Sequence, residues 1–432
     1  MKALIIGAAR SGSACAKMLY DNGYEVYLTD YATIDNKLEL ENEGIKVYDG
    51  GHPDFLKDIK YDLIIKNPGI KETVPFVKYF KDLGYRLYTE IDVAAKIATN
   101  YRFGAITGTN GKTTTTTLLA EFLKCNNPLS SVAGNIGLPL SCVYNEKGNV
   151  KLDIALELSS FQCLRIYNLH PVVSVITNLT LDHADYHGSA DNYYKAKLNV
   201  YKNQSGDDWF LLNIDDETVK AYVKDVKCKI VTYSIKQKAD MYLDGRDVRL
   251  FDEVLFNLDD LRLPGPHNLQ NAMVAACMAY KMGVKIEDIR RVLRGFNGVE
   301  HRLEFVREID GVRYYNDSKG TNPDSTVVAL KSFDNNVILL AGGYDKKTGF
   351  DAIKPYLSHV KRMYVFGATK YQIKEIYPEA IVCETMEEAT KLAHEVAVSG
   401  DTVLLSPMCA SWDQFTCFEQ RGEIFANIVR EF

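Results

Sequence analysis

Short apolar runs alternate with amphipathic stretches through the first hundred residues. The runs over residues 3–7, 25–29, 63–65 and 86–89 have the length and composition of buried strands, and a helical pattern starts near Gly12. Buried strands that alternate with helices are typical of a parallel sheet in an α/β protein. The pattern therefore predicts a Rossmann-like domain over residues 1–99.

The same alternation starts again twice further along the chain. A second unit begins near Tyr101 with a strand, a loop and a helix to about Lys124, and it continues with strands at 153–158 and 172–177, short β-segments within 239–263 and helices at 189–202, 267–282 and 286–296. A third unit opens with a hairpin of 303–309 and 312–315, and strands at 337–340, 363–366, 381–382 and 402–405 then alternate with helices. We predict three α/β domains over 1–99, 100–298 and 299–432, the central one with a mostly parallel sheet of the P-loop ATPase type and the last one Rossmann-like.

A glycine-rich turn at residues 107–114 separates the first strand of the second unit from its helix. Glycines let backbone N–H groups approach phosphate oxygens, Lys112 neutralises their charge, and the Thr113 hydroxyl can bind Mg²⁺. The spacing is shorter than the common G-x-x-x-x-G-K-[ST], which would require glycine at Ile106. A plain glycine turn is the alternative, but strand, loop and helix follow one another in register. The pattern predicts a nucleotide triphosphate site with these residues: Gly108, Thr109, Asn110, Gly111, Lys112, Thr113 and Thr114.

Composition and charge narrow the class of protein. Of the 432 residues, 46% are hydrophobic and 25% are charged, and the net charge of −6 argues against a general binder of nucleic acid or anionic membranes. No apolar run approaches the roughly 18 residues that span a bilayer, and the opening residues are too short for a signal-peptide core. The nine scattered cysteines show no metal-binding spacing. We expect a cytoplasmic protein with reduced thiols that binds neither membranes nor nucleic acid.

Polar residues follow two strands of the predicted central sheet. Glu157, Ser159 and Ser160 end one strand, and His183 follows the next, so both sets are expected at the ligand-binding edge of the sheet. A lone histidine is usually structural, but beside a phosphate loop and an acid the functional interpretation is better. Glu157 is a candidate Mg²⁺ ligand, and His183 a candidate for a second ion or a substrate oxygen.

Other motifs are ambiguous when taken alone. The turn Gly7–Gly12 lacks a full G-x-G-x-x-G, Asp30 fits a ribose-binding acid or a plain turn residue, and the segment 67–70 brings a Pro-Gly pair to a strand end. On spacing alone, Lys195 and Lys197 are expected to be solvated surface charges. Asn268 and Asn271 suit a nucleobase, although Asn268 equally suits a helix cap. Predicted loops of the third unit carry a fork-shaped cation (Arg302), a carboxylate suited to ribose hydroxyls (Asp317) and a lysine (Lys319).

Taken together, these motifs resemble the Mur ligases, the ATP-dependent amide-forming enzymes of peptidoglycan synthesis. The shared segments are 107–114, 265–271, His301-Arg302 and 316–319, and the resemblance covers the whole chain. Segments 157–162, 406–415 and 418–422 resemble the branch of the family that adds D-glutamate. The substrates implied are UDP-N-acetylmuramoyl-L-alanine and D-glutamate, with ATP activating a carboxylate as an acyl phosphate.

The resemblance also implies a catalytic set: Lys112, Glu157, His183, Lys197 and Lys319. Two Mg²⁺ ions are implied, one held by Thr113 and Glu157 and the other by His183. Lys197 would be carbamylated by CO₂, which turns a cation into an anionic metal ligand and reverses the expectation from spacing. The enzyme is expected to act as a monomer.

The remaining implied contacts are with the substrates. The UDP moiety would meet Gly7, Ser11, Gly12, Asp30, Asn67 and Gly69, although many relatives have serine where this chain has Asn67. The muramoyl part would meet Asn135, Ser159 and Gln162, and ATP would also meet Asn268, Asn271, Arg302 and Asp317. D-glutamate would meet Thr321, Ser411, Phe418 and a lysine after Gly342-Gly343, either Lys346 or Lys347, with Lys346 preferred. Alternatives are another Mur ligase, a folylpolyglutamate-synthase-like ligase, or a nucleotide-gated binding protein without turnover.

Overall fold

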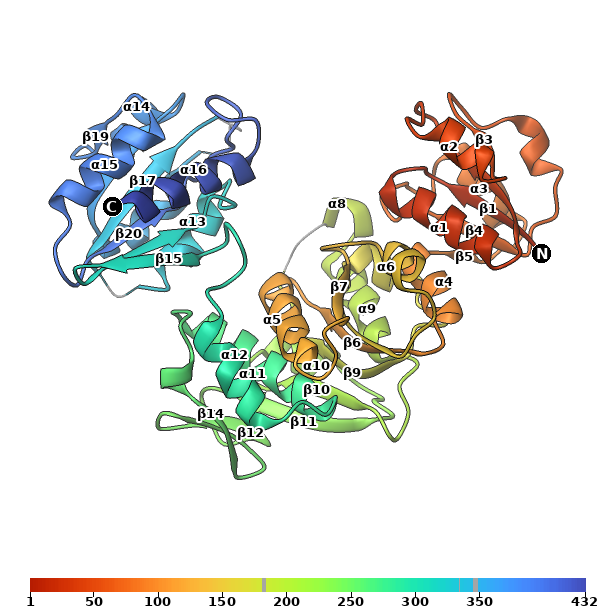
Figure 1. Ribbon diagram of the computed structural model, residues 1–432, viewed down its shortest axis with the longest axis horizontal. Coiled ribbons are helices and arrows are strands. Elements are labelled where there is room, and N and C mark those ends of the chain that lie inside the picture. The colour runs from red at the N-terminus through yellow and green to blue at the C-terminus, as the bar shows by residue number, and fades with distance from the viewer. Residues whose placement is uncertain (181–183, 334, 345–348) are drawn as a thin grey trace. The chain divides into compact units, whose positions relative to one another are not determined.

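The computed structural model describes residues 1–180, 184–333, 335–344 and 349–432. The chain divides into two compact units: the first comprises Met1–Leu258 and Gln270–Val292, and the second Asp259–Leu269 and Leu293–Phe432. Two sheets lie in the first unit and one in the second, and Figure 1 labels most of their strands. All three sheets are mostly parallel, as the alternation of strands and helices predicts.

The first sheet has five parallel strands in the order β3-β2-β1-β4-β5. Its strands are β1 (Lys2–Ile6), β2 (Glu25–Thr29), β3 (Lys46–Tyr48), β4 (Leu63–Lys66) and β5 (Leu87–Tyr88), and its helices are α1 (Arg10–Asp21), α2 (Lys37–Asn42), α3 (Pro75–Asp82) and α4 (Glu90–Ile97). Both faces are buried: Ala3 and Ile5 of β1 pack in one core cluster, and Leu4 and Ile6 in another. The predicted strands are confirmed, whereas three-residue β3 is too short to give a periodic signal.

The second sheet has nine strands in the order β14-β13-β12-β11-β10-β9-β6-β8-β7. They are β6 (Tyr101–Thr107), β7 (Ser131–Gly134), β8 (Leu152–Glu157), β9 (Pro171–Ile176), β10 (Trp209–Asn213), β11 (Lys229–Ser234), β12 (Met241–Asp244), β13 (Asp247–Leu250) and β14 (Glu253–Asn257). The pairings from β7 through β12 are parallel, and β13 and β14 form an antiparallel edge. The helices of this part are α5 (Lys112–Lys124), α6 (Leu140–Lys147), α7 (Ser160–Cys163), α8 (Ala184–His187), α9 (Ala190–Leu198), α10 (Glu217–Tyr222), α11 (Pro266–Lys281) and α12 (Ile286–Gly295).

Strands β7, β10 and β11 have no counterpart in the sequence prediction. β11 carries lysine, threonine and serine among its apolar residues, and Lys229 and Ile230 at its start are exposed. Its apolar pattern is therefore too weak to distinguish a strand near the sheet edge from a solvated loop. Pairing with β10 and β12 decides the conformation instead.

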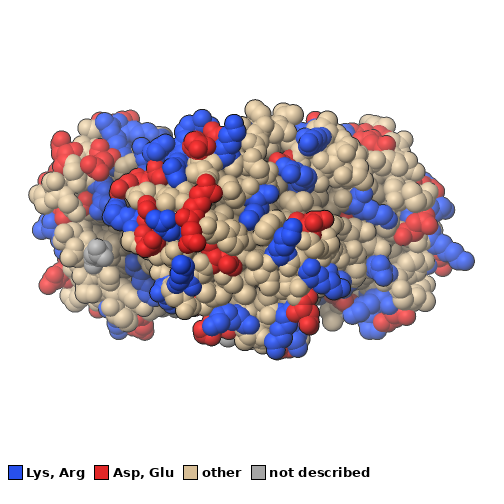
Figure 2. Space-filling model, turned by 90° about the horizontal axis from the view of Figure 1, so that it is seen from below, with Lys and Arg blue, Asp and Glu red and all other residues tan. Residues whose placement is uncertain are grey.

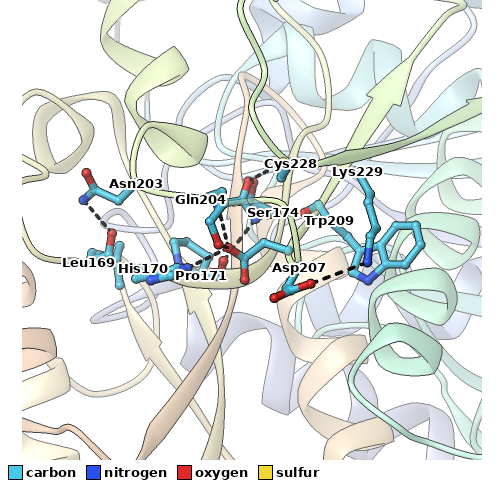
Figure 3. A network of polar contacts seen from close by, with 12 residues as sticks. Leu169, His170, Pro171, Ser174, Asn203, Gln204, Asp207, Trp209, Cys228 and Lys229 are labelled. Carbon is cyan, nitrogen blue, oxygen red and sulfur yellow. Dashed lines mark hydrogen bonds and ion pairs between the residues drawn. The ribbon is translucent and has the colours of Figure 1, made fainter.

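A buried glutamine fastens the crossover between β9 and β10. Gln204 is 3% exposed, and its amide nitrogen donates to the carbonyl oxygens of Pro171 (3.0 Å) and Trp209 (2.9 Å). Its amide oxygen accepts from the hydroxyl of Ser174 at 2.7 Å (Figure 3). One side chain thus satisfies buried polar groups of both strands.

The third sheet has the order β15-β16-β20-β17-β18-β19, with only the β15–β16 pair antiparallel. Its strands are β15 (Glu304–Ile309), β16 (Val312–Asn316), β17 (Val337–Gly342), β18 (Val360–Phe366), β19 (Ile381–Val382) and β20 (Thr402–Leu405). The helices are α13 (Pro323–Leu330), α14 (Lys370–Ile376), α15 (Met386–Val396) and α16 (Phe418–Glu431). The predicted hairpin and all four later strands are confirmed.

Charged side chains of both signs are interspersed on the face shown in Figure 2. Over the described ranges, we find no helix with the length and apolar character that crossing a membrane requires.

Candidate active site

The predicted phosphate loop connects β6 to α5 and is fastened to the segment that follows β9. Asn178 accepts from the Asn110 N–H at 2.9 Å and donates to the Asn110 carbonyl at 2.9 Å, and its own carbonyl accepts from the Thr109 N–H at 3.0 Å. Gly108 has φ +142°, and a side chain there would collide with Thr177. The loop therefore has one well-determined shape, and Asn178, to which the sequence reasoning gave no role, fixes it.

Two lysine side chains converge on this loop. The Lys112 ammonium donates to the carbonyls of Gly108 (3.0 Å) and Thr109 (2.9 Å), and the Lys197 ammonium donates to the same Gly108 carbonyl at 2.8 Å. Lys197 is 1% exposed, so the prediction from spacing alone that it is a solvated surface charge is wrong. The expectation is confirmed for Lys195, which is exposed and pairs with Asp191 at 2.7 Å. Two cations beside a glycine loop make a site for a strongly anionic ligand.

Burial of Lys197 follows from the aromatic residues of α9. Its ammonium lies 4.7 Å from the centre of the Tyr193 ring, and the Tyr193 hydroxyl lies 3.2 Å from the Thr109 hydroxyl. Lys197 and Tyr193 are one helical turn apart, so a single face of α9 meets the loop.

Glu157 ends β8 at the same edge of the sheet, opposite Ile106 of β6. It is 1% exposed, and one carboxylate oxygen accepts from the Asn135 amide at 2.8 Å. The other oxygen, Oε2, is buried and has no hydrogen-bond partner among the described residues. A buried carboxylate oxygen left open next to a phosphate loop fits a hard cation such as Mg²⁺. His183, the candidate ligand for a second ion, lies outside the described residues.

Of the predicted muramoyl contacts, Asn135 bonds to this carboxylate, and Ser159 and Gln162 follow β8. Asn135 also donates its N–H to the Glu157 carbonyl at 2.9 Å. Ser159 and Gln162 form a capping box at the start of α7, in which the Ser159 N–H and hydroxyl donate to the Gln162 amide oxygen at 2.9 Å each. Their role toward the substrate stays a prediction, but the contacts explain how both side chains are oriented.

The threonines after the loop lie in the first turn of α5. Thr113 is partly exposed and Thr114 is 8% exposed. Asn271 of α11 reaches this turn, because its amide oxygen accepts from the Thr115 hydroxyl at 3.3 Å and a side chain at Gly111 would meet it. Asn268 lies in the first turn of α11, and its amide donates to the Pro264 carbonyl at 2.8 Å; this contact is not a helix cap, so the choice between the two interpretations of Asn268 stays open.

The second unit gathers the other predicted ATP contacts. Asp317 is 6% exposed and accepts from the Ser406 hydroxyl at 2.7 Å and the Leu303 N–H at 3.2 Å. Burial raises the pKa of this carboxyl to about 7, and hydrogen bonding to Ser406 opposes the shift. Arg302 is exposed, and the Lys319 ammonium lies 5.4 Å from the centre of the Phe418 ring. Asp317, Lys319 and Phe418 thus share one edge of the third sheet.

The predicted D-glutamate contacts are only partly described. Thr321 follows this turn, Ser411 is 2% exposed, and Phe418 begins α16. Lys346 and Lys347 lie outside the described residues, so the choice between them stays a prediction.

Sequence reasoning gave no role to Arg421, although it is the largest fully buried side chain among the described residues. Its guanidinium donates to the carbonyls of Ser318 (2.8 Å), Cys409 (3.1 Å) and Ala410 (3.3 Å), and so ties the turn of Lys319 to the loop of Ser411. Burial lowers its pKa to about 10. The available signal was its place on the apolar stripe of α16 with Phe425 and Val429.

Among the N-terminal candidates, Asp30 lines a cavity of about 650 Å³, whereas Gly7, Ser11, Gly12, Asn67 and Gly69 are not among its lining residues. Asp30 accepts from the N–H groups of Ala8 (2.6 Å) and Ala32 (3.0 Å), and so joins the first turn to the loop after β2. Gly12 packs on the Gly7 carbonyl, where a side chain would collide. The cavity is lined by α1, α2 and the end of β2, with Cys142, Asn145 and Glu146 of α6 closing one side.

Known proteins resemble this chain over nearly its whole length. Residues 106–279 match the Mur ligase middle domain, and residues 301–409 match the Mur ligase glutamate ligase domain. The chain is 40% identical to the UDP-N-acetylmuramoylalanine–D-glutamate ligase of Geobacillus sp. (strain WCH70), covering 100% of this chain and 97% of the relative. It is 41% identical to the enzyme of the same name from Ligilactobacillus salivarius, covering 100% and 96%.

Solved structures share the fold at lower identity. The UDP-N-acetylmuramate-alanine ligase of Thermotoga maritima aligns with a TM-score of 0.59 at 20% identity, over 100% of this chain and 99% of that one. A pseudomurein peptide ligase from Methanothermus fervidus aligns with a TM-score of 0.56 at 18% identity, over 100% and 99%.

Proposed function

The chain belongs to the Mur ligase family, and from this membership we propose that it joins D-glutamate to UDP-N-acetylmuramoyl-L-alanine in the synthesis of the peptidoglycan precursor, with ATP as the energy source. Support comes from relatives with that activity in their names, which align with 99–100% of this chain at 40–41% identity. It is an ATP-dependent, amide-forming ligase. ATP and the sugar nucleotide are both cytoplasmic metabolites, so the enzyme would act there, as a monomer.

The observation that carries the proposal is the convergence of Lys112, Lys197 and the open oxygen of Glu157 at the ends of β6, β8 and β9. The reaction must bring the substrate carboxylate and the γ-phosphate of ATP together, although both are anions. Lys112 beside the loop amides would offset this repulsion and hold the phosphate in line for attack. The amine of D-glutamate would then displace phosphate from the acyl phosphate, forming the amide bond.

Mg²⁺ would be held by Glu157 and the Thr113 hydroxyl, with His183 at a second ion, and would neutralise charge on the transferred phosphoryl group. The open oxygen of Glu157 fits this role. A carbamate formed on Lys197 would add an anionic oxygen beside the same loop. Buried and hydrogen-bonded to a carbonyl, Lys197 is held in one place, as such a ligand requires.

The proposal assigns three domains to the chain: residues 1–99 for the UDP moiety, 100–298 for ATP, and 299–432 for D-glutamate and the rest of the ATP site. The cavity at Asp30 would receive the uridine end, and Asn135, Ser159 and Gln162 the muramoyl part. Thr321, Ser411, Phe418 and Lys346 would receive the amino acid. Asp317 and Arg302 would contact the ribose and phosphates.

An acceptor panel tests the proposal. The full chain, ATP, Mg²⁺ and UDP-N-acetylmuramoyl-L-alanine are incubated with D-glutamate, L-glutamate, L-alanine or glycine, and phosphate release is measured. We expect release only with D-glutamate, and ¹⁸O from a labelled substrate carboxylate should appear in that phosphate. Folate as a competing carboxylate controls for a folylpolyglutamate-synthase-like activity. No release with any amino acid would overturn the proposal.

A further inference from the structure

A buried lysine lies beneath the loop that follows β4. Lys66 is the last residue of β4, pairs with Ile6 of β1, and is 2% exposed. Its ammonium donates to the carbonyl oxygens of Asn67 (3.0 Å), Pro68 (3.3 Å) and Ile70 (2.5 Å). A lysine ammonium has three donors, and here three carbonyls of one short loop occupy them.

Within the described part of the chain, no carboxylate balances this charge. Lys66 forms no ion pair among the described residues, and the nearby acid Glu72 is paired with Arg165 and, at 2.8 Å, with Lys81. Burial and the charge of Arg165 lower the pKa of Lys66 to about 8. A buried ammonium without a counter-ion is unfavourable, and a bound anion would relieve that cost.

The loop above Lys66 packs directly on the first turn of the chain. A side chain at Gly7 would lie within 3.0 Å of Asn67 and Ile70, so residues 67–70 and the Gly7–Gly12 turn touch at the carboxyl edge of the sheet. Helix α1 begins at Arg10, and the first N–H groups of a helix lack intrahelical partners and attract anions. Lys66 draws three carbonyl oxygens inward, so their negative ends point away from this edge.

We propose that Lys66 is a positioning residue for the substrate's diphosphate: its ammonium holds the loop 67–70 with the carbonyl oxygens turned inward and supplies positive charge beneath the anion. The inference rests on the proposed function, which assigns the UDP moiety to this domain with its uridine end in the cavity at Asp30 and the diphosphate at the carboxyl edge formed by this loop and the Gly7–Gly12 turn. Direct contact is not required, because the three donors already have partners. Lys66 would therefore affect binding of the diphosphate much more than binding of the nucleoside.

The test compares UDP with uridine, because the two share the base and the ribose and differ by the diphosphate. Affinities are measured by calorimetry for the full-length wild type, Lys66→Met and Lys66→Arg. One charge near a dianion in a region of reduced dielectric contributes on the order of ten- to a hundredfold in affinity. We expect Lys66→Met to weaken UDP by at least about tenfold and uridine by less than about twofold, and Lys66→Arg to restore much of the loss.

Kinetics give a second readout. With ATP and D-glutamate saturating, Lys66→Met should raise KM for UDP-N-acetylmuramoyl-L-alanine by a similar factor and leave kcat within about threefold. The reason is that the lost interaction stabilises the bound substrate and the transition state equally. Lys60→Met, an exposed lysine on the segment that leads into β4, is the matched control and should change neither. Equal weakening of UDP and uridine, or no weakening of either, would overturn the inference. Failure of the wild type to bind UDP would instead count against the proposed function.

If Lys66→Met does not fold, the pH dependence of ligand binding to the wild-type protein tests the role of Lys66 instead. The ratio of UDP to uridine affinity should fall as pH rises from 7 to 9.5, because Lys66 loses its proton in the free enzyme. UDP and uridine carry the same uracil base, so ionisation of that base affects both affinities equally and cancels in their ratio. Near the loop, Arg165 and Glu72 are paired with each other, and burial raises the pKa of Tyr186, whose hydroxyl donates to the Pro68 carbonyl, so that this phenol stays neutral over the range. A constant ratio would refute the role of Lys66.

Discussion

Replacing Glu157 by glutamine removes one negative charge from the end of β8 and keeps the shape of the side chain. One oxygen can still accept from Asn135, as Oε1 does at 2.8 Å in the wild type. The position of Oε2, buried and without a partner among the described residues, becomes an amide NH₂ that cannot bind a cation. The substitution therefore separates the cost of burying a charge from the benefit that this charge brings to catalysis.

The two effects have opposite signs. An unsatisfied buried polar group costs about 1–3 kcal/mol, and more when it is charged. Glu157→Gln exchanges an unsatisfied charged oxygen for an unsatisfied neutral amide, so it should stabilise the ligand-free protein by about 1 kcal/mol. For a protein of this size, that corresponds to a rise in Tm of roughly 2–4 °C or less. Turnover should fall about 10²- to 10³-fold, or about 3–4 kcal/mol, which is typical for loss of one electrostatic contact to a transition state.

Asp153→Asn on the same strand is the matched control. Asp153 is 7% exposed, and its two oxygens accept from Arg102 at 2.7 and 2.8 Å, at the end of β8 away from the loop. This variant should lose about 1 kcal/mol of stability and keep kcat within about threefold. Thermal unfolding with and without Mg²⁺ and a non-hydrolysable ATP analogue, together with phosphate release, measures both effects. Glu157→Gln with activity within tenfold of the wild type, or with a large loss of stability, would refute the reasoning.

Three further outcomes are expected. Lys197→Ala should lose nearly all turnover and recover part of it with short-chain carboxylates, whereas Lys195→Ala should keep it; unaided full activity of Lys197→Ala in the phosphate assay would contradict the carbamate role. Gln204→Leu should lower the free energy of unfolding in urea by about 2–4 kcal/mol, because it leaves the Ser174 hydroxyl and two carbonyls without their partner. For Asp317, a folded pKa of about 7 against about 3.9 unfolded means that the unfolded state binds fewer protons between these values, so stability falls as pH rises from 4 to 7. Relative to Asp317→Asn, the wild type should lose up to about 4 kcal/mol over that range, and identical pH profiles in urea unfolding would exclude the shift.

Local pattern was sufficient for most of the fold. Strands buried on both faces give continuous apolar runs, as in β17, where Val337 and Leu339 enter one core and Ile338 and Leu340 the other. The glycine loop was recognisable because its geometry demands glycine at 108 and 111, whatever surrounds it. β11 was missed because its mixed composition acquires strand structure only from its neighbours.

For the site, the sequence by itself determined which chemical groups are present and at which strand ends they lie: Lys112 after β6 and Glu157 at the end of β8. The role of Lys197 in the site was predicted only from the resemblance to a family, because its spacing along the helix predicts a solvent-exposed side chain. Only the tertiary structure decided that Lys197 is buried against the loop, that Glu157 keeps one oxygen open, and that Lys66 and Arg421 hold loops from beneath. The reason is physical: hydrogen bonds and burial depend on groups brought from distant segments, and no local periodicity encodes those partners.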